Sequence, residues 1–176
     1  MNLDKLMEVQ GGLDSHVVLE KGLEEQDLFN QKVLALQVEI AELANETRCF
    51  KFWSSKEPSE PEIQLEEYVD GIHFFLSLAI DLKMEPSSLM VWDDFTEANL
   101  TETLLSVLSE ISSLYVLKDV NLPASIFLED LQEILREAFQ VYVGIASKFL
   151  GFSWEEVEEA YYKKNNINHQ RQLNGY

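Results

Sequence analysis

Two pairs of acidic residues are spaced so that each pair can place both carboxylates on one face of a helix. Glu39 and Glu42 lie three positions apart, and so do Glu67 and Asp70. Residues three apart are neighbours on a helix surface, so each pair presents two carboxylates to one point in space. A single pair of this kind in an acidic chain usually belongs to a solvated face, and other observations must decide between the two interpretations.

The predicted surroundings of these acids favour a site over a solvated face. Glu39 borders an apolar helical stripe that contains Leu36, and Asp70 lies on the same side of its helix as Phe74. Like charges at this spacing repel each other, and burial adds a desolvation cost of several kcal/mol per ion. We therefore expect a cation between the two pairs. All-oxygen ligands suit Mg²⁺, or Mn²⁺, better than zinc. Such an ion typically binds phosphate oxygens and lowers the pKa of a bound water.

The few basic residues support a polyphosphate ligand. Six of the 13 lysines and arginines fall in two short segments, and an acidic protein needs local cations of this kind to hold a phosphate chain. Charges near helix carboxyl ends also complement the helix dipole, which alone could explain some of them. The six residues are Arg48, Lys51, Lys56, Lys163, Lys164 and Arg171.

Length and composition set the wider limits. The chain has 176 residues, 46% of them hydrophobic, which suits one globular domain with its own core. Its 13 basic and 32 acidic residues give a formal charge of −19, which argues against nucleic acid or an anionic membrane as partner. Cys49 is the single cysteine, so no internal disulfide forms. We see neither a signal peptide nor an apolar run of about 20 residues, and expect a cytoplasmic protein.

Apolar residues repeat at helical spacing along most of the chain and nowhere alternate as in a strand, which predicts an all-α single domain over 1–176. We expect a bundle of about six helices with the metal site between the second and third. The predicted ranges are 3–20, interrupted or bent near Gly11 and Gly12, then 24–49, about 60–83, 97–118, 125–150 and a short helix over 153–164, followed by a polar tail over 165–176.

Local signals mark several of these helix ends. Ser59 with Glu62, and Ser153 with Glu156, have the spacing of capping boxes. Gly151 is expected to close the fifth helix in a left-handed conformation, and Pro123 to separate the fourth helix from the fifth. After Val69 the third helix is apolar nearly all round, which predicts a central, buried position in the bundle.

The acidic motif and its neighbours resemble a known family. Glu39-x-x-Glu42 and Glu67-x-x-Asp70 are similar to the E-x-x-E and E-x-x-D signature of the all-α nucleoside triphosphate pyrophosphatases, the MazG-like superfamily. The match is closest to the dimeric dUTP diphosphatases of some bacteria, phages and kinetoplastids. Further matching stretches are 10–14 (Gln-Gly-Gly-Leu-Asp), 50–53, His73 after the last acid, and the tail 164–176, which is similar to the family's K-N-x-L-N-x-x-R-x-x-N-G-Y ending. Residues 84–122 carry no matching motif.

The resemblance implies a Mg²⁺-dependent homodimer that hydrolyses dUTP to dUMP and pyrophosphate. Glu39, Glu42, Glu67 and Asp70 would hold the metal, and Glu39 would act as general base. It also implies that the deoxyuridine nucleotide is bound by residues from several segments. These are Gln10, Asp14, Trp53, His73, Phe74 and Asn168 around the nucleoside, and Lys51, Lys56, Lys164, Arg171 and Tyr176 near the phosphates, with Asn165 beside them in the tail motif.

Two other functions are compatible with the sequence. Side-chain amides can present a donor or an acceptor, so a dCTP, mixed dUTP/dCTP or other MazG-like pyrophosphatase is the first alternative. The second is a non-catalytic, acidic helical module that binds a basic partner through its charge of −19. The enzyme interpretation predicts stabilisation by Mg²⁺, and the binding module predicts none. The resemblance favours a bacterial or phage-infected cell as the source.

Overall fold

The computed structural model describes residues 1–118 and 124–175, and these residues form helices and connecting loops without a strand. The all-α class predicted from the sequence is confirmed. In chain order the α-helices are α1 (Leu3–Lys21), α2 (Phe29–Thr47), α3 (Pro61–Asp81), α4 (Leu100–Lys118), α5 (Ala124–Ile145) and α6 (Trp154–Leu173). A short 3₁₀ helix covers Pro86–Leu89, and a π-helical turn, Ala146–Leu150, follows α5.

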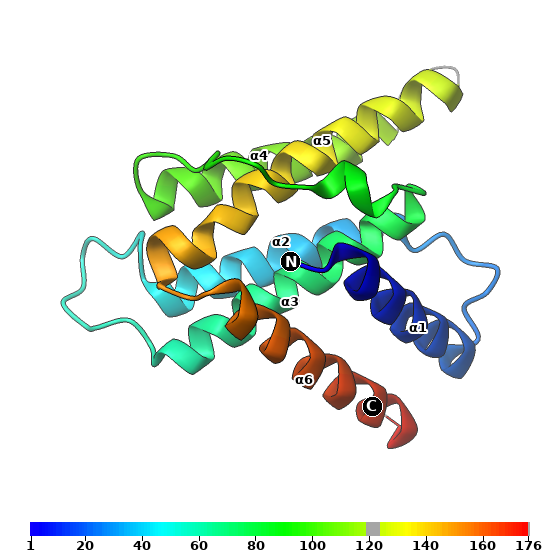
Figure 1. The fold of residues 1–176 in the computed structure, drawn as a ribbon, viewed down its shortest axis with the longest axis horizontal. Coiled ribbons are helices and arrows are strands. Elements are labelled where there is room, and N and C mark those ends of the chain that lie inside the picture. The colour runs from blue at the N-terminus through cyan, green and yellow to red at the C-terminus, as the bar shows by residue number, and fades with distance from the viewer. Residues whose placement is uncertain (119–123, 176) are drawn as a thin grey trace.

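Helix α3 lies at the centre of the bundle, as its apolar pattern predicts. It packs against α1, α2, α5 and α6, which surround it (Figure 1). The side chains of Ile72, Phe75, Leu76 and Leu78 on α3 are at most 1% exposed. This central position holds the third helix's acidic residues in a fixed place relative to α2 and α6.

Helices α4 and α5 form a long hairpin that extends past the other helices in Figure 1. Helix α4 buries Leu104, Val107, Ile111 and Leu114, and its opposite side stays open. Among the described residues, α4 is the one helix long and apolar enough to cross a membrane, with 28% of it buried. Length and composition are weak evidence for a span, because core helices of soluble proteins pass the same test.

Several predicted helix boundaries are wrong. Helix α1 continues through Gly11 and Gly12 without interruption. Gly11 faces α3, where an added Cβ would lie 3.8 Å from Ile80. Helix α2 begins five residues later than predicted, and the Asp27 carboxylate, two positions before its first residue, accepts a hydrogen bond from the Phe29 backbone N–H.

The two predicted capping boxes have opposite outcomes. Ser153 and Glu156 form theirs at the start of α6, as predicted. Ser59 does not cap α3, because its hydroxyl donates to the Glu46 carboxylate instead. Gly151 adopts the expected left-handed conformation with φ 78°. The expected break at Pro123 lies outside the described residues.

The carboxyl-terminal segment is the largest correction. The predicted short helix and polar tail form one 20-residue helix, α6, that reaches Leu173. Two contacts with α1 hold its second half in place. The Asn165 side chain donates to the Val9 carbonyl at 3.5 Å, and His169 Nδ1 lies 2.7 Å from His16 Nδ1. Polar composition therefore reflects interhelical hydrogen bonding in this segment.

Candidate active site

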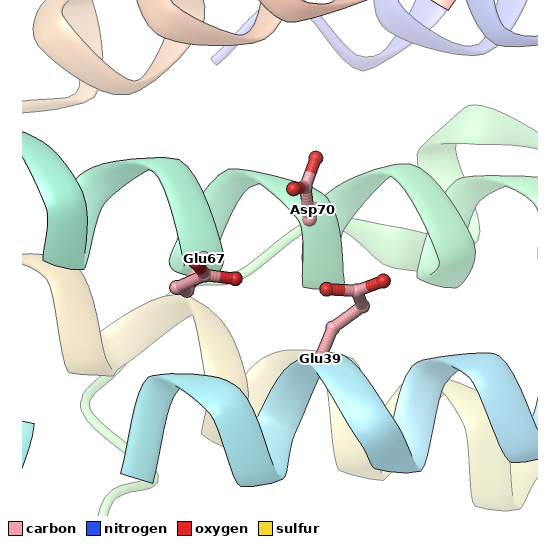
Figure 2. Close-up of side chains that lie close together, drawn as sticks. All are labelled: Glu39, Glu67 and Asp70. Atoms are coloured by element: carbon pink, nitrogen blue, oxygen red, sulfur yellow. The ribbon is translucent and has the colours of Figure 1, made fainter. Parts of the chain in front are cut away.

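Three acidic side chains meet between α2 and α3. Glu39 on α2 and Glu67 and Asp70 on α3 each offer an oxygen within 4.8 Å of the other two. Figure 2 shows Glu39 extending from α2 toward the turn of α3 that carries Glu67 and Asp70. All three side chains are half-buried. The predicted i, i+3 spacing on α3 thus brings two carboxylates to one place, and α2 adds the third.

Burial and mutual repulsion raise the pKa values of two carboxyl groups in this cluster. Burial, followed by the charges of Asp70 and Glu42, raises the pKa of Glu39 to about 7. Burial and the neighbouring Glu42 and Asp70 likewise raise the pKa of Glu67 to about 7. Carboxylates crowded in this way are stabilised in their ionised form by a cation.

Glu42 occupies the solvent side of the cluster. Its side chain is exposed, and its carboxyl group contacts that of Glu67. It is not among the three acids whose oxygens converge. The structure therefore brings Glu42 next to the cluster, one helical turn from Glu39, where its carboxyl group contacts that of Glu67.

Lys164 forms ion pairs with Asp70 of the cluster and with the neighbouring Glu66. Its Nζ lies 2.6 Å from an Asp70 oxygen and 2.7 Å from a Glu66 oxygen, and its side chain is 10% exposed. Burial alone lowers the pKa of Lys164, but its hydrogen bonds with Asp70 and Glu66 outweigh that effect and raise the pKa overall. Lys164 therefore stays charged and neutralises one side of the cluster.

The donor set fits a hard divalent cation. The three converging groups are all carboxylates, and neither a histidine nor a cysteine is among them. Oxygen-only donors are what Mg²⁺ and Mn²⁺ prefer, whereas zinc sites use histidine or cysteine. The raised pKa values of Glu39 and Glu67 indicate charge that Lys164 leaves uncompensated.

A cavity of about 400 Å³ adjoins the acidic cluster, since Glu39 and Asp70 belong to both. Helices α1, α2, α3 and α6 form its walls. Nine of the predicted site residues line it, which places most of the family-implied set around one space: Gln10, Asp14, Glu39, Asp70, His73, Phe74, Lys164, Asn168 and Arg171. Its volume is in the range of small-molecule sites.

A chain of hydrogen bonds crosses the wall of this cavity. The Gln10 side-chain oxygen accepts a hydrogen bond of 2.7 Å from the Tyr161 hydroxyl and lies 2.8 Å from His73 Nδ1. Gln10 Nε2 donates to Asp14 Oδ1 at 2.7 Å, and Ser77 donates to the other Asp14 oxygen at 2.7 Å. The network joins α1, α3 and α6 and leaves Gln10 only 3% exposed.

His73 is a neutral member of that network. Burial, with the nearby positive charge of Lys164, lowers the pKa of His73 to about 3. The Tyr161 ring stacks on its imidazole with centroids 3.9 Å apart. Because the Gln10 oxygen accepts, His73 Nδ1 carries the proton. Its Nε2 has no hydrogen-bond partner in the described part of the chain.

Other predicted substrate residues lie outside the cavity wall. Lys51 donates to the Asn45 backbone carbonyl and side chain, and Lys56 is exposed. Trp53 is 64% exposed and packs against Phe50 and Phe52 in the same loop. These loop residues are not brought to the cavity in this conformation.

Two predicted residues of the carboxyl-terminal motif also stand apart from the cavity. Asn165 is buried against α1 and does not line the wall. Tyr176 lies outside the described residues.

Sequence reasoning missed several residues that shape the site. Ser77 and Lys32 line the cavity, Tyr161 holds Gln10, and Glu66 holds Lys164. Tyr161 precedes Lys164 by three positions, so the helical spacing could have placed it on the same face. Lys32 comes from another helix and pairs with Asp14 and Asp81 across space, which no local pattern reveals.

Comparison with known families gives a match over nearly the whole chain. The family model described as dUTPase covers residues 2–176, which includes both acidic motifs, the cavity wall and α6. No curated protein sequence matches the chain. The chain therefore belongs to the all-α dUTPase family and is a dUTP diphosphatase enzyme.

Proposed function

We propose that this member of the dUTPase family hydrolyses dUTP to dUMP and pyrophosphate with Mg²⁺ at the acidic cluster. The observation that carries the proposal is that Glu39 and Asp70 belong both to the cluster and to the cavity. A triphosphate in the cavity would therefore lie against the ligands of the ion. Bound Mg²⁺ would neutralise charge on the phosphate oxygens and make a water molecule more acidic.

Different side chains have different roles in the proposed reaction. We assign Glu39, Glu42, Glu67 and Asp70 to the metal, with Glu39 as the group that takes a proton from the attacking water. A carboxylate is a common general base for an attacking water, and Glu39 lies at the edge that the acidic cluster shares with the cavity. Lys164 and Arg171 line the cavity and supply positive charge for the phosphates. Phe74, Gln10 and Asn168 line the part assigned to the nucleoside.

The proposal also includes the substrate contacts that the family resemblance implies for the remaining residues. The loop carries Lys51, Trp53 and Lys56 outside the cavity wall, so their substrate contacts stay predictions. Asp14 and His73 line the wall, but their described hydrogen bonds go to protein groups.

We also propose that the enzyme works as a homodimer. Helix α4 exposes a set of apolar side chains away from the core, with Leu105 61%, Tyr115 52% and Val116 63% exposed. Apolar area of this kind is commonly covered in an oligomer. Sedimentation at micromolar concentration should give twice the chain mass of 20.3 kDa, and a monomer would contradict this part.

The proposed activity is tested with a panel of deoxynucleoside triphosphates, with Mg²⁺ or with a chelator. We expect dUMP and pyrophosphate from dUTP, and loss of turnover without the metal. A thermal titration with Mg²⁺ and a non-hydrolysable dUTP analogue should raise the Tm. If the enzyme prefers dCTP, its activity is that of a dCTP pyrophosphatase, the first alternative function. If the protein neither hydrolyses a nucleotide nor gains stability from Mg²⁺, the remaining function is the non-catalytic acidic module that binds a basic partner.

A further inference from the structure

Lys164 on α6 is shared between two carboxylates of α3. Its ammonium group donates to an Asp70 oxygen at 2.6 Å and to a Glu66 oxygen at 2.7 Å. Glu66 and Asp70 lie four positions apart, so their side chains are neighbours on one face of the helix. The Lys164 side chain is only 10% exposed, and an ammonium group in such a position is costly to leave without a carboxylate partner.

The two carboxylates differ in their relation to the acidic cluster. Asp70 belongs to the cluster and also lines the cavity. Glu66 is not one of the three converging acids and does not line the cavity, and its side chain is 55% exposed. A divalent cation in the cluster would therefore use the charge of Asp70 and leave that of Glu66 to Lys164.

Lys164 and a cation in the cluster need the same Asp70 charge. Lys164 contacts Oδ2 of Asp70 directly, so the ammonium group and the ion would share one carboxylate, and their like charges repel each other. The bond from Lys164 to Glu66 is not subject to this competition. It keeps the ammonium group paired and in the cavity wall, where Lys164 already lies.

We infer that Glu66 is a positioning residue that holds Lys164 in the cavity wall and thereby leaves the Asp70 carboxylate available to the divalent cation. This inference rests on the proposed function for the place of the ion, and it adds a residue outside the two acidic motifs. Without the charge of Glu66, Asp70 is the one of these two carboxylates that can neutralise Lys164. Lys164 then competes more strongly with the ion.

Glu66→Gln tests this by removing the charge while keeping the shape and an oxygen that accepts a hydrogen bond. The probe is Mn²⁺ without nucleotide, and the electron paramagnetic resonance signal of free Mn²⁺ gives the dissociation constant. We expect the Kd to rise about five- to tenfold, because a charge-assisted hydrogen bond to Lys164 is replaced by a neutral one. Glu39→Gln removes a carboxylate of the cluster and identifies which part of the measured binding belongs to it.

The Lys164→Met background separates positioning from the simple loss of a negative charge. Methionine does not compete with the ion for Asp70, so adding Glu66→Gln to Lys164→Met should change the Kd by about twofold or less. A direct electrostatic effect of Glu66 on the ion would instead raise the Kd by the same factor in both backgrounds. Melting temperatures in chelator establish that each variant is folded.

Two further variants test the role of the charge. Glu66→Asp keeps the carboxylate, and the flexible lysine side chain can follow it, so this variant should recover part of the affinity that Glu66→Gln loses. A loss as large as that of Glu66→Gln would contradict the inference. Glu62→Gln, the matched control, removes an exposed acid one helical turn before Glu66 and should leave the Kd unchanged.

The outcomes separate this inference from the proposed function. If the unmodified protein binds Mn²⁺ and hydrolyses dUTP, an unchanged Kd in Glu66→Gln overturns the inference and leaves the function standing. Equal weakening by Glu66→Gln in both backgrounds has the same meaning. A Kd that depends on the background, in a protein that does not hydrolyse dUTP, supports the inference and removes the function. A protein that does not bind Mn²⁺ at the cluster removes both.

Discussion

The Tyr142 hydroxyl donates a 3.0 Å hydrogen bond to the backbone carbonyl of Tyr68, and the two rings stack with centroids 4.9 Å apart. Tyr68 in turn donates to the carbonyl of Val143 at 3.2 Å. Both phenols are buried, and burial raises the pKa of each. The pair joins α5 to the turn of α3 that carries Glu67 and Asp70, so it fixes the backbone from which these acids project.

Gly71→Ala should break this arrangement. A Cβ at position 71 would overlap the Tyr142 hydroxyl and lie 2.7 Å from its Cζ, so the ring must move. We expect a loss of about 1–3 kcal/mol in the free energy of unfolding, measured in urea, and reduced activity. Gly12→Ala is the control, because nothing lies within 4 Å of its added Cβ. Helix propensity predicts a gain of about 0.5–1 kcal/mol there. Equal changes in the free energy of unfolding for the two substitutions would contradict this role of the Tyr68–Tyr142 pair.

Glu39→Gln should keep the fold and remove most of the turnover. Glutamine has the same shape but neither accepts the proton nor supplies the charge that the ion needs. We expect kcat to fall about 10²–10⁴-fold, the usual contribution of a general base, or further if metal binding is lost. Glu129→Gln on the exposed side of α5 should leave kcat unchanged. Hydrolysis of dUTP by Glu39→Gln at the normal rate would remove the base assignment.

Without metal, the protein should lose stability as the pH rises through the acidic range. The folded state raises the pKa of Glu67 from an ordinary 4.5 to about 7, chiefly through burial. Between these values the folded chain keeps a proton that the unfolded chain releases, so the free energy of unfolding falls with increasing pH. Glu67→Gln should reduce the fall in Tm between pH 5 and pH 8 in chelator.

Two comparisons check this interpretation of the pH dependence. Mg²⁺ should restore the Tm of the unmodified protein at pH 8, because it stabilises the ionised cluster. Glu62→Gln, an exposed acid in the first turn of α3, should retain the full pH dependence. A Glu67→Gln profile that coincides with the unmodified one would show that Glu67 carries no raised pKa.

Lys164→Met should destabilise the metal-free protein. Removing the ammonium group leaves Asp70, whose side chain is 15% exposed, without its cation. We expect a loss of about 1–3 kcal/mol, less than for a fully buried pair because solvent screens Glu66. Lys163→Met, one residue earlier and exposed, is the control. Equal melting temperatures for the two variants in chelator would contradict the role of Lys164.

The sequence is most informative where helical spacing alone determines proximity. The spacing of Glu67 and Asp70 places them on one turn, and the apolar surface around Phe75 places that helix at the centre. Both predictions follow from the geometry of one helix. The resemblance then adds residues of α1 and α6, such as Gln10 and Asn168, that no single-helix pattern connects.

Contacts between helices account for what the sequence does not predict. The polar residues at the end of α6 predict a tail, yet the Asn165 side chain donates a hydrogen bond to α1. Ser59 has the spacing of a cap but bonds to Glu46 on another helix. Each outcome depends on a partner distant in the chain, and pairwise spacing within one element carries no information about it.

The contact between His16 and His169 makes the end of α6 sensitive to acid. Their Nδ1 atoms lie 2.7 Å apart and their rings stack, so one nitrogen donates and the other must be unprotonated. Burial, and then the neighbouring His16, lowers the pKa of His169 below its ordinary 6.5. A histidine with a lowered pKa stabilises the fold in its neutral form, so this stability is present above pH 6.5 and lost as the pH falls through the folded pKa.

We therefore expect the protection of the last turns of α6 to weaken as the pH falls below 6.5. Hydrogen-exchange protection factors over residues 168–173 should fall between pH 7.5 and pH 5, while those of α3 stay constant. Because Asn168 and Arg171 line the cavity, the KM for dUTP should rise over the same range. His169→Gln should make protection of this segment independent of pH, since glutamine does not titrate. An equal loss of protection in His169→Gln would place the acid-sensitive group elsewhere.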